Sequence, residues 1–395
     1  MKRLFNSLRH NNFRLFWFGQ LISLSGTWIQ TIAQGWLVLE LTNSAFLLGM
    51  INAIAAMPIM LFSLIAGVVA DRVNKKHILE VTQWLSMILA FLMGLLVSLK
   101  MAQFWNIAIV VAMLGVVNAF DIPARQSFIV EMVGKEDLNN AIALNSFLFN
   151  AARIIGPVIV GFLAGWLGIA SCFYVNGVSF LAVIIALIFI KGDFMAKDIS
   201  GGTITEGLVD GARYVWSHKN IRSLTAITAI SSIFGMANVV LMPIFARDIL
   251  KVGIKGLGVL MAVVGLGAIL GALTLARFSH FKEKQVFIKS GTVILSLSLI
   301  LFSVSKVYLA SLILLFSAGW GIITQAATVN TMLQLNTPDK LRGRVMSFYT
   351  LMFLGMTPVG SFQAGLFAHW FSAPVALLFS GFMCLILTIL FFKDI

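Results

Sequence analysis

Long apolar runs recur along almost the whole 395-residue chain, and they limit the possible folds more than any other feature. A helix needs roughly 20 mostly apolar residues to cross a bilayer. Twelve such runs have the approximate bounds 13–39, 44–69, 78–99, 103–122, 139–165, 168–190, 221–246, 256–276, 286–304, 307–333, 345–368 and 373–392. They are too long, and alternate too weakly in polarity, for barrel strands. The pattern predicts an all-α membrane protein with twelve transmembrane helices.

The distribution of basic residues predicts the orientation in the membrane. A net charge of +13 alone would be compatible with nucleic-acid binding. If the N-terminus is cytoplasmic, however, 22 of the 28 lysines and arginines fall on the cytoplasmic side, and the outer side has only Lys100, Arg247, Lys251, Lys255 and Lys306. By the positive-inside rule we expect a multi-pass cell-membrane protein with both termini in the cytoplasm, a bacterial inner membrane as its location and no nucleic-acid partner.

One long polar connection divides the predicted spans six and six. The segment from Lys191 to Arg222, "KGDFMAKDISGGTITEGLVDGARYVWSHKNIR", is rich in Gly, Ser, Thr and charge. Its part from Leu208 to Trp216 has the apolar spacing of a helix that lies on the membrane surface. We therefore predict a six-helix bundle over residues 1–191, a cytoplasmic linker over 192–220 and a second six-helix bundle over 221–395.

The two halves resemble each other in sequence. "AGVVADR" around Gly67 matches "GALTLAR" around Gly271, and "GPVIVGFLAG" at 156–165 matches "TPVGSFQAGLFA" at 357–368. Six spans in each half make the repeats parallel, an arrangement that alternating-access transporters use. An old duplication without a surviving mechanism is the alternative interpretation.

A charged segment, "GVVADRVNKK" from Gly67 to Lys76, lies where the second predicted span meets the third. Its bases fit the positive-inside rule, but Asp71 is an acid at a helix end, where it can interact with the N-terminal end of a neighbouring helix. Gly67, one turn earlier, would allow another helix to approach closely. We expect a contact here that holds the cytoplasmic side closed.

This segment resembles the signature loop of the major facilitator superfamily, with Asn74 in place of the usual second glycine. "NFRLFWFGQLISLSGTWIQTIAQGWLVLELTNSAFLLG", "FDIPARQSFIVEMV", "ALNSFLFNAARIIGPVIVGFLAG" and "TPDKLRGRVMSFY" resemble the branch that holds siderophore exporters and macrolide efflux proteins. The resemblance covers nearly the whole chain. It implies the major facilitator fold, a gating loop containing Gly67, Asp71 and Arg72, and a place near that loop for Asp121 and Arg125. The second copy, "GALTLARFSHFK", lacks the acid, so an asymmetric latch is expected.

Polar residues line one face of several predicted spans. In the first span they recur three and four residues apart, which places them on one side of a helix. The candidate substrate-binding residues are Gln20, Ser23, Thr27, Gln30, Gln34, Asn150, Arg153, Ser231, Asn238 and Gln325. Such residues either line a cavity or form hydrogen bonds between helices. We favour the cavity for Gln30, Gln34 and Arg153 and leave the others open.

Arg153 is the one basic residue near the middle of a predicted span, about fifteen residues into 139–165. Placing an arginine at the centre of a membrane helix costs roughly 2.5–3.5 kcal/mol. Helix carbonyls or the amides of Gln30 and Gln34 would offset this cost, and so would an acidic group of the substrate. We favour an anionic substrate, such as a siderophore, over a cationic drug.

No residue pattern indicates catalysis, a metal or another cofactor. Cys172 and Cys384 fall within or at the end of spans and are expected to pack there as free thiols. "GLGAILG" at 265–271 lies inside a span and fits helix packing better than dinucleotide binding. No acid lies at mid-span, so Asp121 is the remaining candidate for a proton carrier, with a structural ion pair to Arg125 as the alternative.

These observations predict a monomeric secondary active transporter, not an enzyme, that exports a small organic molecule by alternating access. Proton coupling, and so an antiporter, is implied by the family resemblance. A lipid or lysolipid flippase on the same fold is the first alternative. A membrane receptor that transports nothing is the second, and the aligned polar faces count against it.

Overall fold

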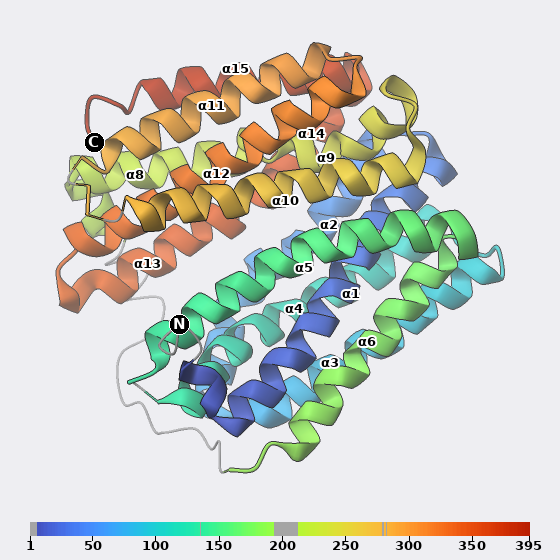
Figure 1. Cartoon of the computed structure of the whole chain (residues 1–395), viewed down its shortest axis with the longest axis horizontal. Helices are drawn as coiled ribbons and strands as arrows, with labels where there is room; N and C mark the ends of the chain where they lie inside the picture. Colours follow the sequence, from blue (N-terminus) through green and yellow to red (C-terminus); the bar gives the residue numbers. More distant parts are fainter. Residues whose placement is uncertain (1–5, 135, 193–211, 279, 282) are drawn as a thin grey trace. The chain divides into compact units, whose positions relative to one another are not determined.

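The computed structural model describes residues 6–134, 136–192, 212–278, 280–281 and 283–395. These residues form helices and their connections, without any strand (Figure 1). Ten helical segments within them are long and apolar enough to cross a membrane, which confirms an all-α membrane protein. The expected count of twelve is not confirmed. The first helix, whose polar face lowers its hydropathy, is not among the ten, and the last has only 17 residues.

The first half of the chain follows the predicted runs closely. Its elements are η1 (Asn6–Arg9), α1 (Asn11–Thr42), α2 (Ala45–Arg72), α3 (Lys75–Ser98), α4 (Phe104–Val133), α5 (Leu138–Leu167) and α6 (Ala170–Phe189). Three of these helices contain a proline, which membrane helices tolerate because their neighbours satisfy the freed backbone groups.

The second half contains one segment that is not a regular α-helix. From Lys219 to Ile249, α8 (Lys219–Ile230), the π-helix η2 (Ser231–Gly235), α9 (Ala237–Ile244) and the π-helix η3 (Phe245–Ile249) follow one another. The remaining elements are α10 (Gly253–Arg277), α11 (Gln285–Val304), α12 (Tyr308–Asn336), α13 (Asp339–Leu354), α14 (Thr357–Trp370) and α15 (Ala373–Ile389). Of the predicted linker helix, residues 208–211 lie outside the described residues, while 212–217 are helical and Val215 is buried.

Contacts divide the chain into two units. Unit 1 comprises residues 1–37 and 57–200, and unit 2 comprises 38–56 and 201–395. Chain order placed residues 38–56 in the first predicted bundle, whereas their contacts group them with unit 2. Gly49 of α2 shows why: a Cβ atom added there would lie 2.6 Å from the Cα of Gly365 in α14. Only residues without side chains allow helices to approach this closely.

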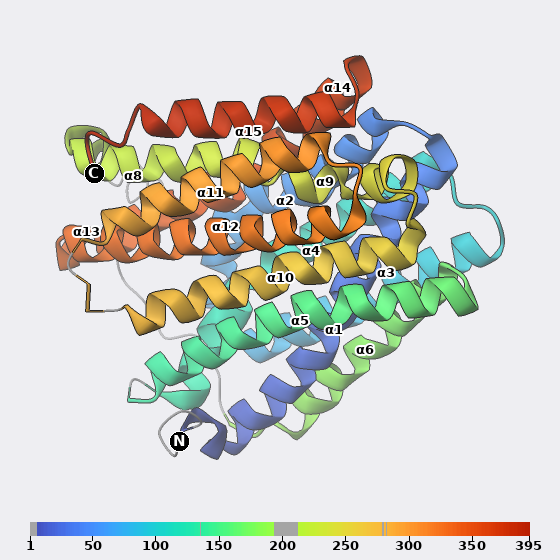
Figure 2. The same ribbon diagram turned by 45° about the horizontal axis from the view of Figure 1, so that its top comes forward.

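In unit 1, α1 lies beside α5 and α6, and α3 packs against α4 and α6 (Figure 2). The start of α1 is fixed to the α4–α5 connection. Asn6 Nδ2 donates to Asp137 Oδ1 at 2.7 Å, and His10 Nε2 lies 2.8 Å from Asp137 Oδ2. A little further on, the indole N–H of Trp17 donates to the Leu144 carbonyl of α5 at 3.0 Å. These bonds set the position of α1 against α5.

In unit 2, α12 lies between α10 and α11 in both views (Figures 1 and 2). Glycines bring the three helices together. A Cβ atom at Gly267 of α10 would lie 1.9 Å from the Phe316 carbonyl oxygen, and one at Gly291 of α11 would lie 2.8 Å from that of Gly321. The glycine-rich "GLGAILG" segment therefore serves helix packing, as expected.

Candidate functional site

Arg153 lies in the middle of α5, where that helix meets α1. Its guanidinium carbon is 5.8 Å from the centre of the Trp28 ring. Trp28 also makes an edge-to-face contact with Phe149, at a centroid distance of 6.0 Å. One turn beyond Arg153, a Cβ atom at Gly156 would lie 2.5 Å from the Cβ of Trp28. Gly156 thus allows the close contact that holds Arg153 against the aromatic ring.

The guanidinium of Arg153 keeps its hydrogen-bond donors free. It makes no ion pair or hydrogen bond with any residue that the structure describes, and the side chain is half-buried. Stacking on an aromatic ring contributes about 0.5–2 kcal/mol, below the roughly 2.5–3.5 kcal/mol cost of an arginine at mid-membrane. The five N–H donors of the guanidinium are therefore available to a ligand.

Two candidate polar residues near Arg153 are bonded elsewhere. Asn150 Nδ2 donates to the Ser146 carbonyl of its own helix at 2.9 Å. Gln30 Oε1 accepts a 2.7 Å hydrogen bond from Asn176 Nδ2 of α6, and both side chains are buried. Gln30 therefore joins α1 to α6, as the helix-bonding interpretation expected, and its cavity role stays a prediction.

Three further candidates of α1 also lie within the helix packing. Ser23 and Gln34 are buried, and the Thr27 hydroxyl donates to the Ser23 carbonyl at 3.0 Å. A hydroxyl bonded within its own helix has its hydrogen occupied. Among the described residues, Arg153 is the candidate of α1 and α5 that carries a charge and has no hydrogen-bond partner.

Asp121 of α4 is buried at the centre of a polar cluster in unit 1. Its Oδ1 accepts from Thr82 Oγ1 at 3.0 Å and from Gln83 Nε2 at 2.8 Å. Its Oδ2 accepts from Arg125 Nη2, one turn along the same helix. Arg125 Nη1 in turn donates to Gln20 Oε1 at 3.1 Å. Gln20, expected in the substrate-binding set, belongs instead to this ion-pair cluster.

The Asp121 cluster is not fully satisfied. Gln20 Nε2 and Gln83 Oε1 are buried without a hydrogen-bond partner among the residues that the structure describes. A buried polar atom left unpaired costs about 1–3 kcal/mol. The arrangement fits the structural ion pair with Arg125, and protonating the carboxylate would disturb at least one of three donors that point at it.

The segment from Gly67 to Lys76 fastens helices within unit 1. Asn74 Oδ1 accepts from the backbone N–H groups of Lys76 and His77 and caps α3. The Lys75 ammonium, whose side chain is only 6% exposed, lies 2.8 Å from Glu131 of α4. Lys76 Nζ donates to the Ile190 carbonyl at the end of α6 at 2.9 Å. The sequence alone assigned these two lysines to membrane topology and did not single out Glu131.

The expected gating residues of this segment are placed as follows. Arg72 is exposed at the end of α2. A Cβ atom added at Gly67 would meet nothing within 4 Å, so the close helix approach expected there is not seen. The side chain of Asp71 lies outside the described part of the structure, and its latch role stays a prediction.

The candidates of unit 2 form an internal hydrogen-bond chain. Ser231 Oγ donates to Gln325 Oε1 at 2.8 Å, and Gln325 Nε2 donates to Thr292 Oγ1 at 2.7 Å. All three side chains are buried, as is Asn238 in α9. Both polar atoms of the Gln325 amide are occupied, so this side chain joins α11, α12 and η2.

Gln363 of α14 was missed by the sequence reasoning. Both polar atoms of its amide are buried without a partner among the described residues. An isolated amide within the apolar "TPVGSFQAGLFA" segment was the signal available, because polar side chains inside membrane helices seldom lack a function. Among the buried polar atoms of the described residues in unit 2, it is the amide with both its nitrogen and its oxygen unpaired.

Solved structures of membrane transporters share this fold. A bacterial homologue of the human lysosomal transporter Spinster superposes with a TM-score of 0.80 at 14% identity, covering 98% of this chain and 96% of its own. The nucleoside transporter NupG gives a TM-score of 0.80 at 11% identity, over 98% and 99% of the two chains. At these identities the likeness shows the fold alone.

Curated relatives match along nearly the full length. The staphyloferrin A transporter of Staphylococcus aureus is 24% identical over 96% of this chain and 95% of its own length. The multidrug efflux pump Tap of Mycolicibacterium fortuitum is 23% identical over 89% and 88% of the two chains. The enterobactin exporter EntS of Shigella boydii is 21% identical over 96% and 91%. Because the family model described as "transmembrane secretion effector" matches residues 3–394, this chain belongs to that family of major facilitator transporters.

Proposed function

We propose that this protein is a secondary active transporter that exports a small organic molecule bearing an acidic group. The observation that carries the proposal is Arg153, whose donors are unused at mid-helix beside the Trp28 ring, which in turn contacts Phe149. A carboxylate or catecholate would accept two parallel hydrogen bonds from a guanidinium, which both neutralises the charge and orients the ligand. Trp28 and Phe149 offer apolar surface to the rest of the molecule.

The relatives support this substrate class without fixing it. Two of the three described above are named for siderophores and one for multidrug efflux. Siderophores carry the acidic oxygen groups that an arginine binds best, whereas a permanent cation would be repelled by Arg153. A siderophore-like anion is therefore the substrate that the Arg153 site favours.

The remaining features of the proposal follow from the sequence. The protein works as a monomer in a bacterial inner membrane, with both termini in the cytoplasm, and it transports its substrate without chemical change. Gly67, Asp71 and Arg72 act in gating. Asp121 with Arg125 is the candidate for proton coupling, because no other acid lies as deep in unit 1 within the described residues.

The proposal is tested by transport into proteoliposomes with an imposed pH gradient, using a catecholate siderophore, a carboxylate siderophore, a macrolide and a cationic dye. Arg153→Lys keeps the charge but loses the two-point geometry, so it should weaken binding of the anions at least tenfold, about 1.4 kcal/mol. Arg14→Lys, at an exposed position of α1, is the matched control. Normal anion transport by Arg153→Lys, or a preference for the dye, contradicts the proposal.

A further inference from the structure

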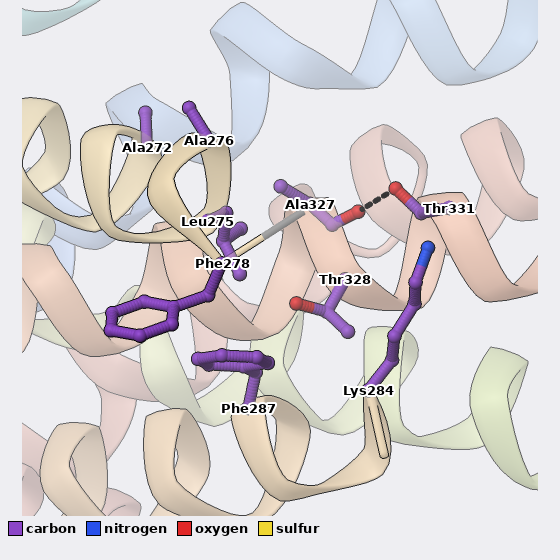
Figure 3. A pocket seen from close by; sticks show the side chains of 9 residues that line it. All are labelled: Ala272, Leu275, Ala276, Phe278, Lys284, Phe287, Ala327, Thr328 and Thr331. Carbon is purple, nitrogen blue, oxygen red and sulfur yellow. Dashed lines mark hydrogen bonds between the residues drawn. The ribbon is translucent and has the colours of Figure 1, made fainter. Parts of the chain in front are cut away.

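A cavity of about 310 Å³ lies in unit 2 where α10 ends and α11 begins (Figure 3). Its floor is α12, with Ala327, Thr328 and Thr331. The α10 wall contributes Ala272 and Ala276, whose small side chains leave the space open. The cavity is built entirely from one unit of the protein and is separate from the Arg153 site.

Helix packing explains why the cavity forms at this end. Gly267, in the middle of α10, and Gly291, near the start of α11, hold these helices tightly against α12. Gly271, one turn further along α10, still lies close to Trp320 of α12. Ala272 and Ala276 lie on another side of α10 and line the cavity. The result is a wedge between α10 and α11 with small residues on its floor.

The two ends of the wedge differ in chemistry. At one end lie the rings of Phe278 and Phe287 (Figure 3). Their centroids are 6.3 Å apart. At the other end, the Lys284 side chain extends beside Thr328 and Thr331. Both threonine hydroxyls donate within α12, to Thr324 at 2.7 Å and to Ala327 at 2.9 Å. The ammonium of Lys284 is therefore the free donor among the side chains that line the cavity.

Lys284 has no ion pair or hydrogen bond with a described residue. Glu283, the acid next to it in sequence, lines a second cavity that Lys284 also borders, and it forms no ion pair with Lys284. A half-buried cation at the rim of an apolar wedge fits an anion that carries a hydrocarbon chain. A free inorganic anion would leave the aromatic end of the wedge unused.

The position of the wedge points to the lipid of the bilayer. The apolar stretch of α10 ends here at the exposed Arg277, so the wedge lies where the hydrocarbon core meets the head groups. Leu273 and Phe278 beside it are 60% and 52% exposed. Basic pockets between membrane helices are typical sites for anionic lipid head groups.

We propose that this wedge binds one anionic phospholipid, with the phosphate at Lys284 and an acyl chain against Phe278 and Phe287. The lipid holds α10 and α11 apart at this end and stabilises unit 2. The positive-inside pattern puts the site in the cytoplasmic leaflet.

The test is native mass spectrometry and thermal unfolding of the purified full chain with phosphatidylglycerol, phosphatidylcholine or soluble glycerol phosphate. We expect preferential retention of one phosphatidylglycerol. Lys284→Ala should weaken it about fivefold, the effect of one basic side chain near an anionic surface. Ala276→Phe, which fills the wedge and keeps the charge, should remove the bound lipid. Lys306→Ala, an exposed base at the opposite end of α11, is the control and should bind normally.

Three results would overturn the proposal: unchanged phosphatidylglycerol retention in both Lys284→Ala and Ala276→Phe, equal retention of phosphatidylcholine, and full competition by glycerol phosphate. The last would instead show a site for a soluble phosphate ester. If Lys284→Ala does not fold, the retention of phosphatidylglycerol by Ala276→Phe alone tests the proposal. None of these measurements depends on export, so the outcome is independent of the proposed function.

Discussion

The ion pair between Asp121 and Arg125 offers the sharpest test of how unit 1 is built. Asp121→Asn keeps the size of the side chain and its acceptor oxygen but removes the negative charge beside Arg125. Asp121 is 4% exposed and Arg125 is 18% exposed at the side chain. Leaving one partner of a buried pair unpaired costs about 3–5 kcal/mol. Because Arg125 is partly exposed and still bonds Gln20, we expect a loss near the lower bound.

A double-mutant cycle isolates the pair from its surroundings. Asp121→Asn and Arg125→Gln should each destabilise the protein, while the double variant should recover part of the loss. The expected coupling energy is about 1–3 kcal/mol. The measurement is chemical unfolding of the purified protein in mild detergent. A coupling energy below about 0.5 kcal/mol, the limit for independent sites, would refute the geometry described for this cluster.

The same variants distinguish a structural role from proton transfer. If Asp121 carries the coupled proton, Asp121→Asn should keep substrate exchange in the absence of a gradient and lose gradient-driven transport. If the pair is only structural, exchange and gradient-driven transport should fall together with stability. Gradient-driven transport at the full rate in Asp121→Asn would exclude Asp121 as the carrier.

Three further predictions concern helix contacts and the N-terminus. Gly156→Val should cost about 1–3 kcal/mol by overpacking the α1–α5 contact and should also weaken substrate binding, seen as paired shifts in unfolding and ligand titration. Gly49→Leu should destabilise the protein by a similar amount, because the contact with Gly365 leaves no room for a side chain. Gly67→Ala is the control: its new methyl group meets nothing within 4 Å, so the stability should be unchanged or slightly raised. The hydrogen bond from His10 lowers the pKa of Asp137 below its ordinary value of 3.8. A depressed carboxyl pKa adds stability above that ordinary value, and this stability is lost as pH falls through the lower pKa. The protection of the η1 amides against hydrogen exchange, relative to the unfolded chain at the same pH, should therefore be high at neutral pH, fall in strong acid, and be low at all pH values in Asp137→Asn.

The sequence by itself determined the membrane character of the chain and the placement of most helices. Length and apolarity of a run are local properties, and the bilayer converts them directly into helices. The isolation of Arg153 at mid-span was also visible, because no other basic residue lies near the middle of a predicted span. In the structure its donors are free and its guanidinium contacts Trp28, which agrees with the prediction that no acid neutralises it. The α1 helix is the exception, because its polar residues lower its mean hydropathy, the property by which the other membrane helices are identified.

Only the tertiary structure decided which neighbour each polar side chain meets. Helical periodicity places Gln20 and Gln30 on one face of α1. It does not predict that Gln20 accepts a hydrogen bond from Arg125 and Gln30 one from Asn176. Lys75 reaches Glu131 because α3 packs on α4, a contact between residues far apart in the chain. The wedge around Lys284 depends on where glycines stop holding three helices together. Such contacts arise from the rotation and crossing of packed helices, which no local pattern in the sequence encodes.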